Sequence, residues 1–150
     1  MNKTFKAHIN TLERKHRDLL ISKQNGISDI PKLPGIYLFS KGKKHLYVGR
    51  TNNLKRRHRE HLSFSVLDAP FAFKMARKAT GNKKATYKEK GSTKHLSSQS
   101  KFRREIKRAK EKIRKMNYRY VVEKDPIKQT LLEIYVAIAL KTPYNDFDTH

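Results

Sequence analysis

Cysteine is absent from this chain of 150 residues, and the absence excludes disulfide bridges, cysteine-rich zinc sites and catalysis by a thiol. Long apolar runs are also missing. The longest, Ile134–Leu140, is far shorter than the ~20 residues that a membrane-spanning helix needs. The first residues lack the apolar stretch of a secretory signal peptide. The sequence therefore predicts an intracellular, cytoplasmic protein that does not enter a membrane.

Acidic residues are scarce as well: 13 Asp and Glu stand against 36 Lys and Arg, which gives a formal net charge of +23. Such an excess attracts polyanions from a distance, so we expect a nucleic acid as partner. The length corresponds to one domain, and we predict a single domain over residues 1–150.

The first half of the chain alternates between helix and strand patterns. Residues 4–20 carry apolar side chains at helical spacing and predict one amphipathic helix that ends near Asn25-Gly26. Two strand-like runs follow, Gly35–Phe39 and His45–Gly49. The turn-like residues 40–43 between them favour a β-hairpin.

Two further helices and a strand are predicted outside the most basic segment. Asn52-Asn53 is a suitable N-cap for a helix to Leu62, whose polar composition places it at a surface or against a ligand. Tyr118–Val122 has the composition of a strand. Residues 127–141 predict a last helix that is apolar almost all round and therefore buried.

The segment 63–116 holds 17 Lys and Arg residues and four acidic ones, which is more than half of the net charge of the chain. It predicts helices over 69–80 and 101–116, joined by a mobile segment over 81–100. One interpretation is a solvated basic surface. The other is binding of backbone phosphates. The candidate nucleic-acid-binding residues, which include three from the preceding part of the chain, are Arg50, Lys55, Arg56, Arg103, Arg104, Lys107, Arg108 and Lys112.

Glu133 lies within the apolar last helix, where an unpaired carboxylate is costly. It either occupies an exposed strip of that helix with Gln129 and Thr130 or binds a divalent metal ion. Oxygen ligands suit Mg²⁺ or Mn²⁺.

Tyr37 and Tyr47 lie on the two strands of the predicted hairpin, where each could be a packing residue or a catalyst. The cations of the following helix would favour their ionised forms. Arg57 and His61 share one face of that helix, which either contacts phosphate as a solvated basic surface or carries catalytic groups. A zinc site at His58 and His61 lacks a third ligand at suitable spacing.

Six positions, in order and on the expected elements, resemble the GIY-YIG nuclease family. Gly35-Ile36-Tyr37 matches the first family motif, and Tyr47-Val48-Gly49 matches the second with Val in place of Ile. Arg57 follows Tyr47 by ten residues, where the family has its catalytic arginine. The remaining matches are a frequent histidine, the metal-binding glutamate and a late asparagine, at His61, Glu133 and Asn145.

The resemblance implies an α+β fold: a small, mainly antiparallel three-stranded sheet flanked by helices. Residues 35–62 and 117–145 would form the catalytic core. An N-terminal helix over 1–30 and a basic helical insertion over 63–116 would be added to it. The implied activity is hydrolysis of phosphodiester bonds by a metal-dependent endonuclease, with DNA as the expected substrate.

The resemblance also implies roles for single residues. Glu133 would hold one Mg²⁺ or Mn²⁺ ion, Tyr37 would act as general base, and Arg57 would pair with the scissile phosphate. Tyr47 would assist Tyr37. The supporting residues would orient groups or relay a proton (His61), steady the metal site (Asn145) and allow close backbone approach (Gly35 and Gly49).

Two alternatives stay open at this point. The chain could be a catalytically silent nucleic-acid-binding protein on the same fold, because fold does not guarantee activity. It could also be a nuclease of structured RNA, since charge alone does not separate RNA from DNA. The sequence leaves open the target specificity, the biological role, the oligomeric state and the group that accepts the Tyr37 proton.

Overall fold

The computed structural model describes residues 1–22, 29–63, 65, 68–81 and 100–147. They form two compact units. The sheet unit holds residues 1–57 and 116–145, and the helical unit holds residues 58–115 with 146 and 147. Helix α3 (Leu54–Leu62) runs from the first unit into the second. No described helix is both long and apolar enough to cross a membrane.

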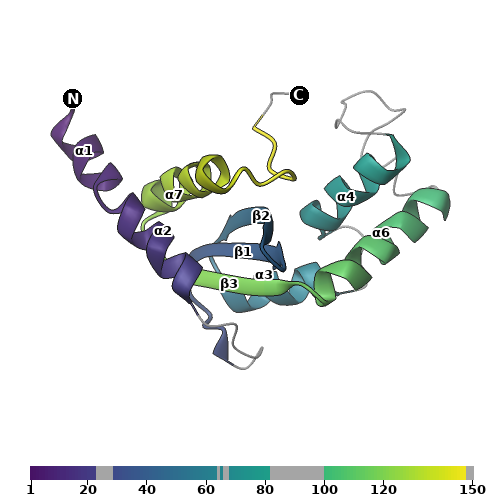
Figure 1. The fold of residues 1–150 in the computed structure, drawn as a ribbon. Coiled ribbons are helices and arrows are strands. Elements are labelled where there is room, and N and C mark those ends of the chain that lie inside the picture. The colour runs from purple at the N-terminus through teal and green to yellow at the C-terminus, as the bar shows by residue number, and fades with distance from the viewer. Residues whose placement is uncertain (23–28, 64, 66–67, 82–99, 148–150) are drawn as a thin grey trace. The chain divides into compact units, whose positions relative to one another are not determined.

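The sheet unit is built on three antiparallel strands, β1 (Gly35–Lys41), β2 (Lys44–Thr51) and β3 (Asn117–Val122). Figure 1 shows β1 between the other two, in the order β2-β1-β3. The hairpin turn uses Gly42 at φ +60°, a left-handed conformation that favours glycine. The predicted α+β fold with a three-stranded antiparallel sheet is confirmed.

One face of the sheet packs against helices α2 (Leu12–Ile21) and α7 (Pro126–Leu140). Alternation along the strands turns one set of side chains to these helices and leaves the tyrosines of the motifs on the opposite face. The buried residues of this core are Leu12, Leu19, Ile36, Leu38, Val48, Leu132, Val136 and Ala137.

The N-terminal segment forms two helices, α1 (Lys3–Ile9) and α2, so the prediction of one continuous helix is wrong. The Thr11 hydroxyl donates to the His8 carbonyl at 2.9 Å, and a hydroxyl that bonds the backbone in this way competes with the helical pattern. Helix α2 ends at Ile21. The predicted end near Asn25-Gly26 lies outside the described residues.

Helix α7 is not buried on all sides, which corrects the prediction made from its composition. Leu132 and Val136 are buried against the sheet, whereas Ile127 and Ile138 are 61% and 71% exposed. The helix has only one face in contact with the sheet and α2, so apolar residues on its other face remain in solvent. The composition of α7 shows that the helix is apolar, but it does not show which face of the helix packs against the rest of the sheet unit.

The helical unit contains α4 (Pro70–Thr80), α6 (Ser100–Arg114) and the second half of α3. The rings of Phe73 and Phe102 lie 4.9 Å apart and join α4 to α6. The predicted apolar stripe of α6 is buried, with Phe102, Ile106, Ala109 and Ile113 each at most 4% exposed. The segment 81–100, predicted to be mobile, lies outside the described residues except for its two ends.

Two cations of α6 cap the C-terminal end of α3. The Lys110 ammonium donates to the carbonyls of Glu60, at 3.2 Å, and Ser63. The Arg114 guanidinium donates to the Leu62 carbonyl at 2.9 and 2.7 Å. The last carbonyls of a helix have no helical i+4 partner, so these bonds supply donors at the end of α3, where the Glu60 carbonyl also accepts from the Ser63 hydroxyl at 3.0 Å.

Candidate functional site

The two motif glycines lie where the backbone meets another part of the sheet unit closely. A Cβ on Gly49 would collide with the Tyr37 ring, which lies across that position from the neighbouring strand. A Cβ on Gly35 would collide with the Val121 carbonyl on β3. Glycine at position 49 therefore makes room for the ring of Tyr37.

Tyr37 and Tyr47 belong to an aromatic cluster on the face of the sheet opposite the apolar core. Their ring centroids lie 6.3 Å apart, and Tyr47 donates a hydrogen bond to the Tyr37 oxygen. Tyr118 stacks on Tyr37 at 5.9 Å with an interplanar angle of 23°. Sequence reasoning missed Tyr118, although it and Tyr120 occupy alternate positions of one strand, a pattern that places both on one face.

The charges around Tyr37 oppose one another. Burial raises the pKa of the Tyr37 hydroxyl, the positive charge and hydrogen bond of Arg57 lower it, and the negative charge of Glu133 raises it. The net result is a pKa above the ordinary value for tyrosine. The expectation that nearby cations would leave the ionised form favoured is therefore wrong for this tyrosine, because desolvation outweighs Arg57.

Tyr47 differs from Tyr37 in the direction of its hydrogen bond. Burial raises the pKa of Tyr47 well above its ordinary value, and the charges of Tyr37 and Glu133 add to this effect. Because Tyr47 donates to Tyr37, its own ionisation would break that bond. Of these two tyrosines, Tyr37 is the one whose ionised oxygen would be stabilised by donors from both Arg57 and Tyr47.

Arg57 is positioned by the first turn of α3, which is fixed at several points. The Asn53 side chain accepts from the Arg56 amide at 3.0 Å, as the predicted N-cap would. The amides of Leu54 and Lys55 donate to carbonyls of residues 33 and 31, at 2.9 and 3.1 Å. The start of α3 is thus held against the segment that leads into β1.

Glu133 is positioned by α7, whose N-terminus is capped by Asp125. The Asp125 carboxylate accepts from the amides of Ile127 and Lys128 at 2.8 and 3.1 Å. Glu133 is half-buried, and its charge raises the pKa values of Tyr37 and Tyr47. The carboxylate therefore belongs to the same electrostatic site as the two tyrosines and Arg57.

The other two predicted site residues have different surroundings. His61 is fully buried, follows Arg57 by one helical turn and belongs to the helical unit. The Asn145 side chain accepts from the Val48 amide at 2.9 Å and donates to the Val48 carbonyl at 2.7 Å. Its oxygen also accepts from the Thr142 hydroxyl at 2.7 Å, so Asn145 holds β2.

Glu133 is the predicted metal ligand of this site. Within the described part of the chain, no cluster of three or more His, Cys, Asp and Glu residues is suited to a metal ion. Mg²⁺ commonly keeps several waters and binds proteins through one or two carboxylates together with substrate phosphates. A single carboxylate at Glu133 fits that kind of site.

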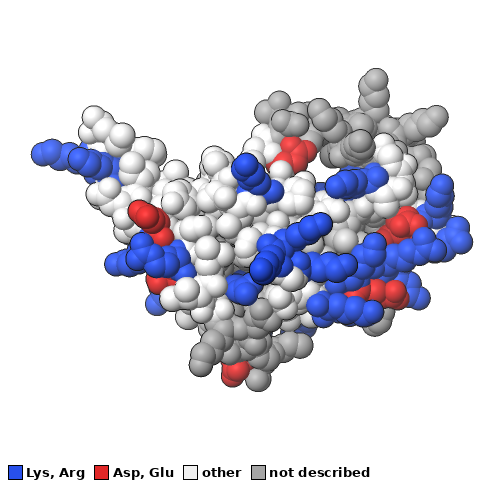
Figure 2. Space-filling view, in the orientation of Figure 1, with Lys and Arg blue, Asp and Glu red and all other residues white. Residues whose placement is uncertain are grey.

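The candidate nucleic-acid-binding residues lie mostly at the surface. Arg50, Arg56 and the five α6 residues are exposed, and Lys55 is half-buried. Figure 2 shows Lys and Arg crowded over the helical unit with few acidic side chains among them. One of the five α6 cations, Arg108, pairs with Glu105 at 2.7 Å. Lys110, by contrast, is 2% exposed and is turned inward.

A model of the GIY-YIG catalytic domain matches residues 33–137. This chain belongs to the GIY-YIG nuclease family. The matched region contains both tyrosine motifs, Arg57, His61 and Glu133, and it includes most of the helical unit; Asn145 lies beyond it.

A curated relative in the comparison is the UvrABC system protein C of Aquifex aeolicus (strain VF5). It is 44% identical over 46 residues, which are 31% of this chain and 8% of that protein. The GIY-YIG chain thus spans less than a tenth of the length of this relative.

Proposed function

We propose that this GIY-YIG protein is a metal-dependent endonuclease that hydrolyses phosphodiester bonds in DNA, with Mg²⁺ or Mn²⁺ as cofactor. The observation that carries the proposal is the electrostatic grouping of Tyr37, Tyr47, Arg57 and Glu133 in one unit. A purely DNA-binding surface has no use for a half-buried carboxylate beside two buried tyrosines.

In this proposal, Arg57 binds the phosphate of the substrate. Its planar guanidinium suits a phosphate, and its charge would compensate the charge that develops there during hydrolysis. The same group donates a hydrogen bond to Tyr37, so it ties the phosphate to the general base. Arg57 thereby sets the distance between the attacked phosphorus and the Tyr37 oxygen.

Tyr37 takes the proton of the attacking water in this proposal. Its raised pKa means that the hydroxyl is protonated at neutral pH, so a hydroxide ion from solvent must take up its proton, forming water, before it can act as a base. Arg57 and Tyr47 stabilise the resulting phenolate. Glu133 would hold Mg²⁺ or Mn²⁺, which when bound supplies Lewis-acid stabilisation of the phosphate oxygens.

Asn145 acts as a positioning residue in this proposal. Its hydrogen bonds hold the backbone of Val48, which follows Tyr47 on β2. Asn145 thereby helps to position Tyr47, the residue that donates to the general base Tyr37. A role of His61 in orienting groups or relaying a proton stays a prediction.

The test is relaxation of supercoiled plasmid by the purified protein with Mg²⁺ or Mn²⁺ and with EDTA. We expect metal-dependent nicking by the wild type and a loss of about 10³-fold in Glu133→Gln. DNA binding should be retained. The control is Glu13→Gln, which changes an exposed helical carboxylate of the same unit and should cut normally.

Normal cutting by Glu133→Gln would refute the role given to that carboxylate. Wild-type protein that binds DNA but cuts neither with Mg²⁺ nor with Mn²⁺ would favour the silent binding protein, and cutting confined to structured RNA would favour the RNA nuclease.

A further inference from the structure

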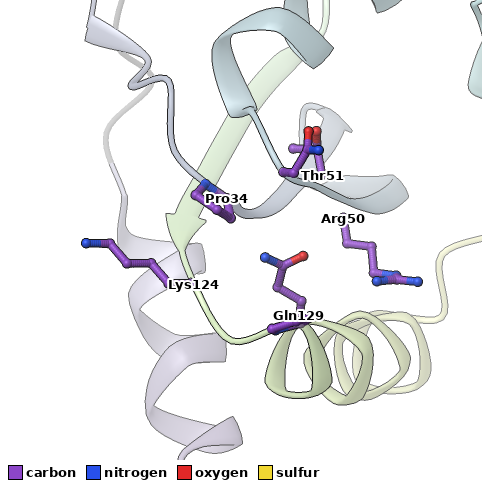
Figure 3. A pocket seen from close by; sticks show the side chains of 7 residues that line it. Pro34, Arg50, Thr51, Lys124 and Gln129 are labelled. Carbon is purple, nitrogen blue, oxygen red and sulfur yellow. The ribbon is translucent and has the colours of Figure 1, made fainter.

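A pocket of about 450 Å³ opens on the sheet unit where β2 ends and α7 begins. Figure 3 shows Arg50 and Thr51 on one side of it, Gln129 on the first turns of α7 and Lys124 on the loop after β3. Of the residues that line it, Arg50 has been given a role above, as a candidate nucleic-acid-binding residue.

The pocket is suited to an anion. Its lining includes the cations Arg50 and Lys124, the neutral polar residues Thr51, Asn52 and Gln129, and no carboxylate. Neither cation forms an ion pair with another described residue. Two cations beside neutral hydrogen-bonding groups attract a phosphate or carboxylate.

The floor of the pocket is fixed before any ligand arrives. Gln129 is only 5% exposed, and its amide nitrogen donates to the Glu123 carbonyl at 2.6 Å. The Glu123 carboxylate is held elsewhere, since it accepts from the Asp125 amide at 3.2 Å and pairs with Lys15 at 3.9 Å. The carboxylates on either side of Lys124 therefore both have other partners, since that of Asp125 accepts from two backbone amides of α7.

Three chain connections place the pocket beside the candidate site. Arg50 follows Gly49, against which the Tyr37 ring lies. Gln129 precedes Glu133 by four residues on α7, so the two share a helix face about 6 Å apart along the axis. Asn52 accepts a hydrogen bond from Arg56, the neighbour of Arg57, at 2.7 Å.

We propose that this pocket binds two successive backbone phosphates of the nucleic acid that flank the bond to be cut. Arg50 and Lys124, which lie on opposite sides of the pocket, would each contact one phosphate, and Gln129 would face the sugar between them, for which the volume leaves room. The inference rests on the proposed function. Its consequence is that the pocket sets the position of the strand and contributes to binding more than to the chemical step.

The experiment compares two double variants that each remove two positive charges from the sheet unit. Arg50→Gln with Lys124→Gln changes the pocket, and Lys41→Gln with Lys44→Gln changes the exposed hairpin turn. Binding of a DNA duplex is measured in EDTA over a range of salt concentrations. We expect the pocket variant to lower the slope of log K against log salt by about 1.8, or 0.9 for each phosphate that is no longer neutralised, and the hairpin variant to leave it unchanged.

Two further readouts locate the effect. In single-turnover cleavage with Mg²⁺, the pocket variant should need about tenfold more protein for half-maximal rate while its maximal rate stays within about twofold of wild type. In NMR titration, inorganic phosphate should shift the signals of residues 50, 124 and 129 in the wild type. The melting temperatures of both variants serve as the folding control.

Each outcome decides between the two proposals. Equal salt slopes for the two double variants would overturn the pocket inference, whether or not the protein cuts DNA. A pocket-specific change in slope in a protein that does not cut would support the pocket and refute the proposed hydrolysis. Phosphate-induced shifts without any difference between the variants in duplex binding would mark a site for free phosphate and would also overturn the inference.

Discussion

Helices α6 and α7 have fifteen residues each, and each holds a charged side chain whose surroundings set it apart from the exposed charges. In α6 this residue is Lys110, whose ammonium donates to oxygens of Glu60 and Ser63 at the end of α3. In α7 it is Glu133, whose charge acts on Tyr37 and Tyr47. The charge of Lys110 is contacted by carbonyl groups, whereas the charge of Glu133 acts on tyrosines that can ionise.

Under the proposed function, the difference separates a structural charge from a chemical one. Burial lowers the pKa of Lys110, the nearby Arg114 lowers it further, and Asp68 opposes them. Carbonyls at a helix end are fixed partial negative charges, so they compensate this cation without any ligand. The surroundings of Glu133 change with the ionisation of the tyrosines, which is the behaviour expected of a reacting site.

The largest expected difference between the two helices concerns activity. Glu133→Gln should reduce cleavage by about 10³-fold while leaving the melting temperature within a few degrees of wild type. Lys110→Met should cut DNA at the wild-type rate once the fraction of folded protein is taken into account. Plasmid relaxation and calorimetry on the same samples test this prediction. A large fall in the melting temperature of Glu133→Gln would show that Glu133 stabilises the fold as well.

The second difference concerns stability. Lys110→Met removes the ammonium that donates to the Ser63 carbonyl and one of the donors to the Glu60 carbonyl, which also accepts from the Ser63 hydroxyl at 3.0 Å, and we expect the free energy of unfolding to fall by about 2 kcal/mol. Lys112→Met, on the exposed face of the same helix, should change it by less than about 0.5 kcal/mol. Urea unfolding followed by circular dichroism measures both. Equal losses would show that the capping bonds do not stabilise the helical unit.

A smaller effect should come from the outer face of α6. Replacing Lys107, Arg108 and Lys112 with Gln should weaken duplex binding about tenfold at low salt and lower the salt slope by about 0.9 for each phosphate that these side chains no longer neutralise. Arg108 already pairs with Glu105, so its share should be the least. Fluorescence anisotropy over a salt series gives the slope.

The matched control for the α6 variant removes three exposed charges from α1 and α2, through Lys3→Gln, Lys6→Gln and Arg14→Gln. If both triple variants change the slope equally, the effect belongs to the net charge of the protein and not to α6.

The smallest effect concerns Tyr37 at alkaline pH. Its pKa in the folded chain lies above the value of about 10 in the unfolded chain, so its contribution to stability is present below pH 10. That contribution is lost as the pH rises through the folded value. We expect Tyr37→Phe to lose less stability than wild type between about pH 9 and pH 11. Urea unfolding at several pH values tests it, and parallel losses would contradict the assignment.

Local patterns were enough to predict much of the sheet unit. The glycine-containing turn, the strand over Gly35–Phe39 and the Asn53 cap each depend on neighbouring residues, and the structure has all three. The buried stripe of α6 follows from helical spacing in the same way. Tyr37, Tyr47, Arg57 and Glu133 were identified from the family resemblance, and the structure groups them in one electrostatic site.

The remaining features depend on contacts between distant parts of the chain. Spacing could not show that α7 is covered on one face only, nor that burial outweighs Arg57 at Tyr37. The pocket joins Arg50 on β2 to Lys124 on the loop after β3, and these residues are far apart in sequence. The sequence did not show that the Lys110 side chain points inward, because composition does not distinguish an inward-facing cation from an outward-facing one.

The hydrogen bonds of Asn145 have one more consequence. Strand β2 is at the edge of the sheet, and the Val48 amide and carbonyl that Asn145 occupies would otherwise be open to a strand from another molecule. The Tyr144 amide covers the Leu46 carbonyl in the same way, at 3.2 Å. A residue predicted to steady a metal site thus also ends the sheet, and guards a highly charged protein against aggregation through strand addition.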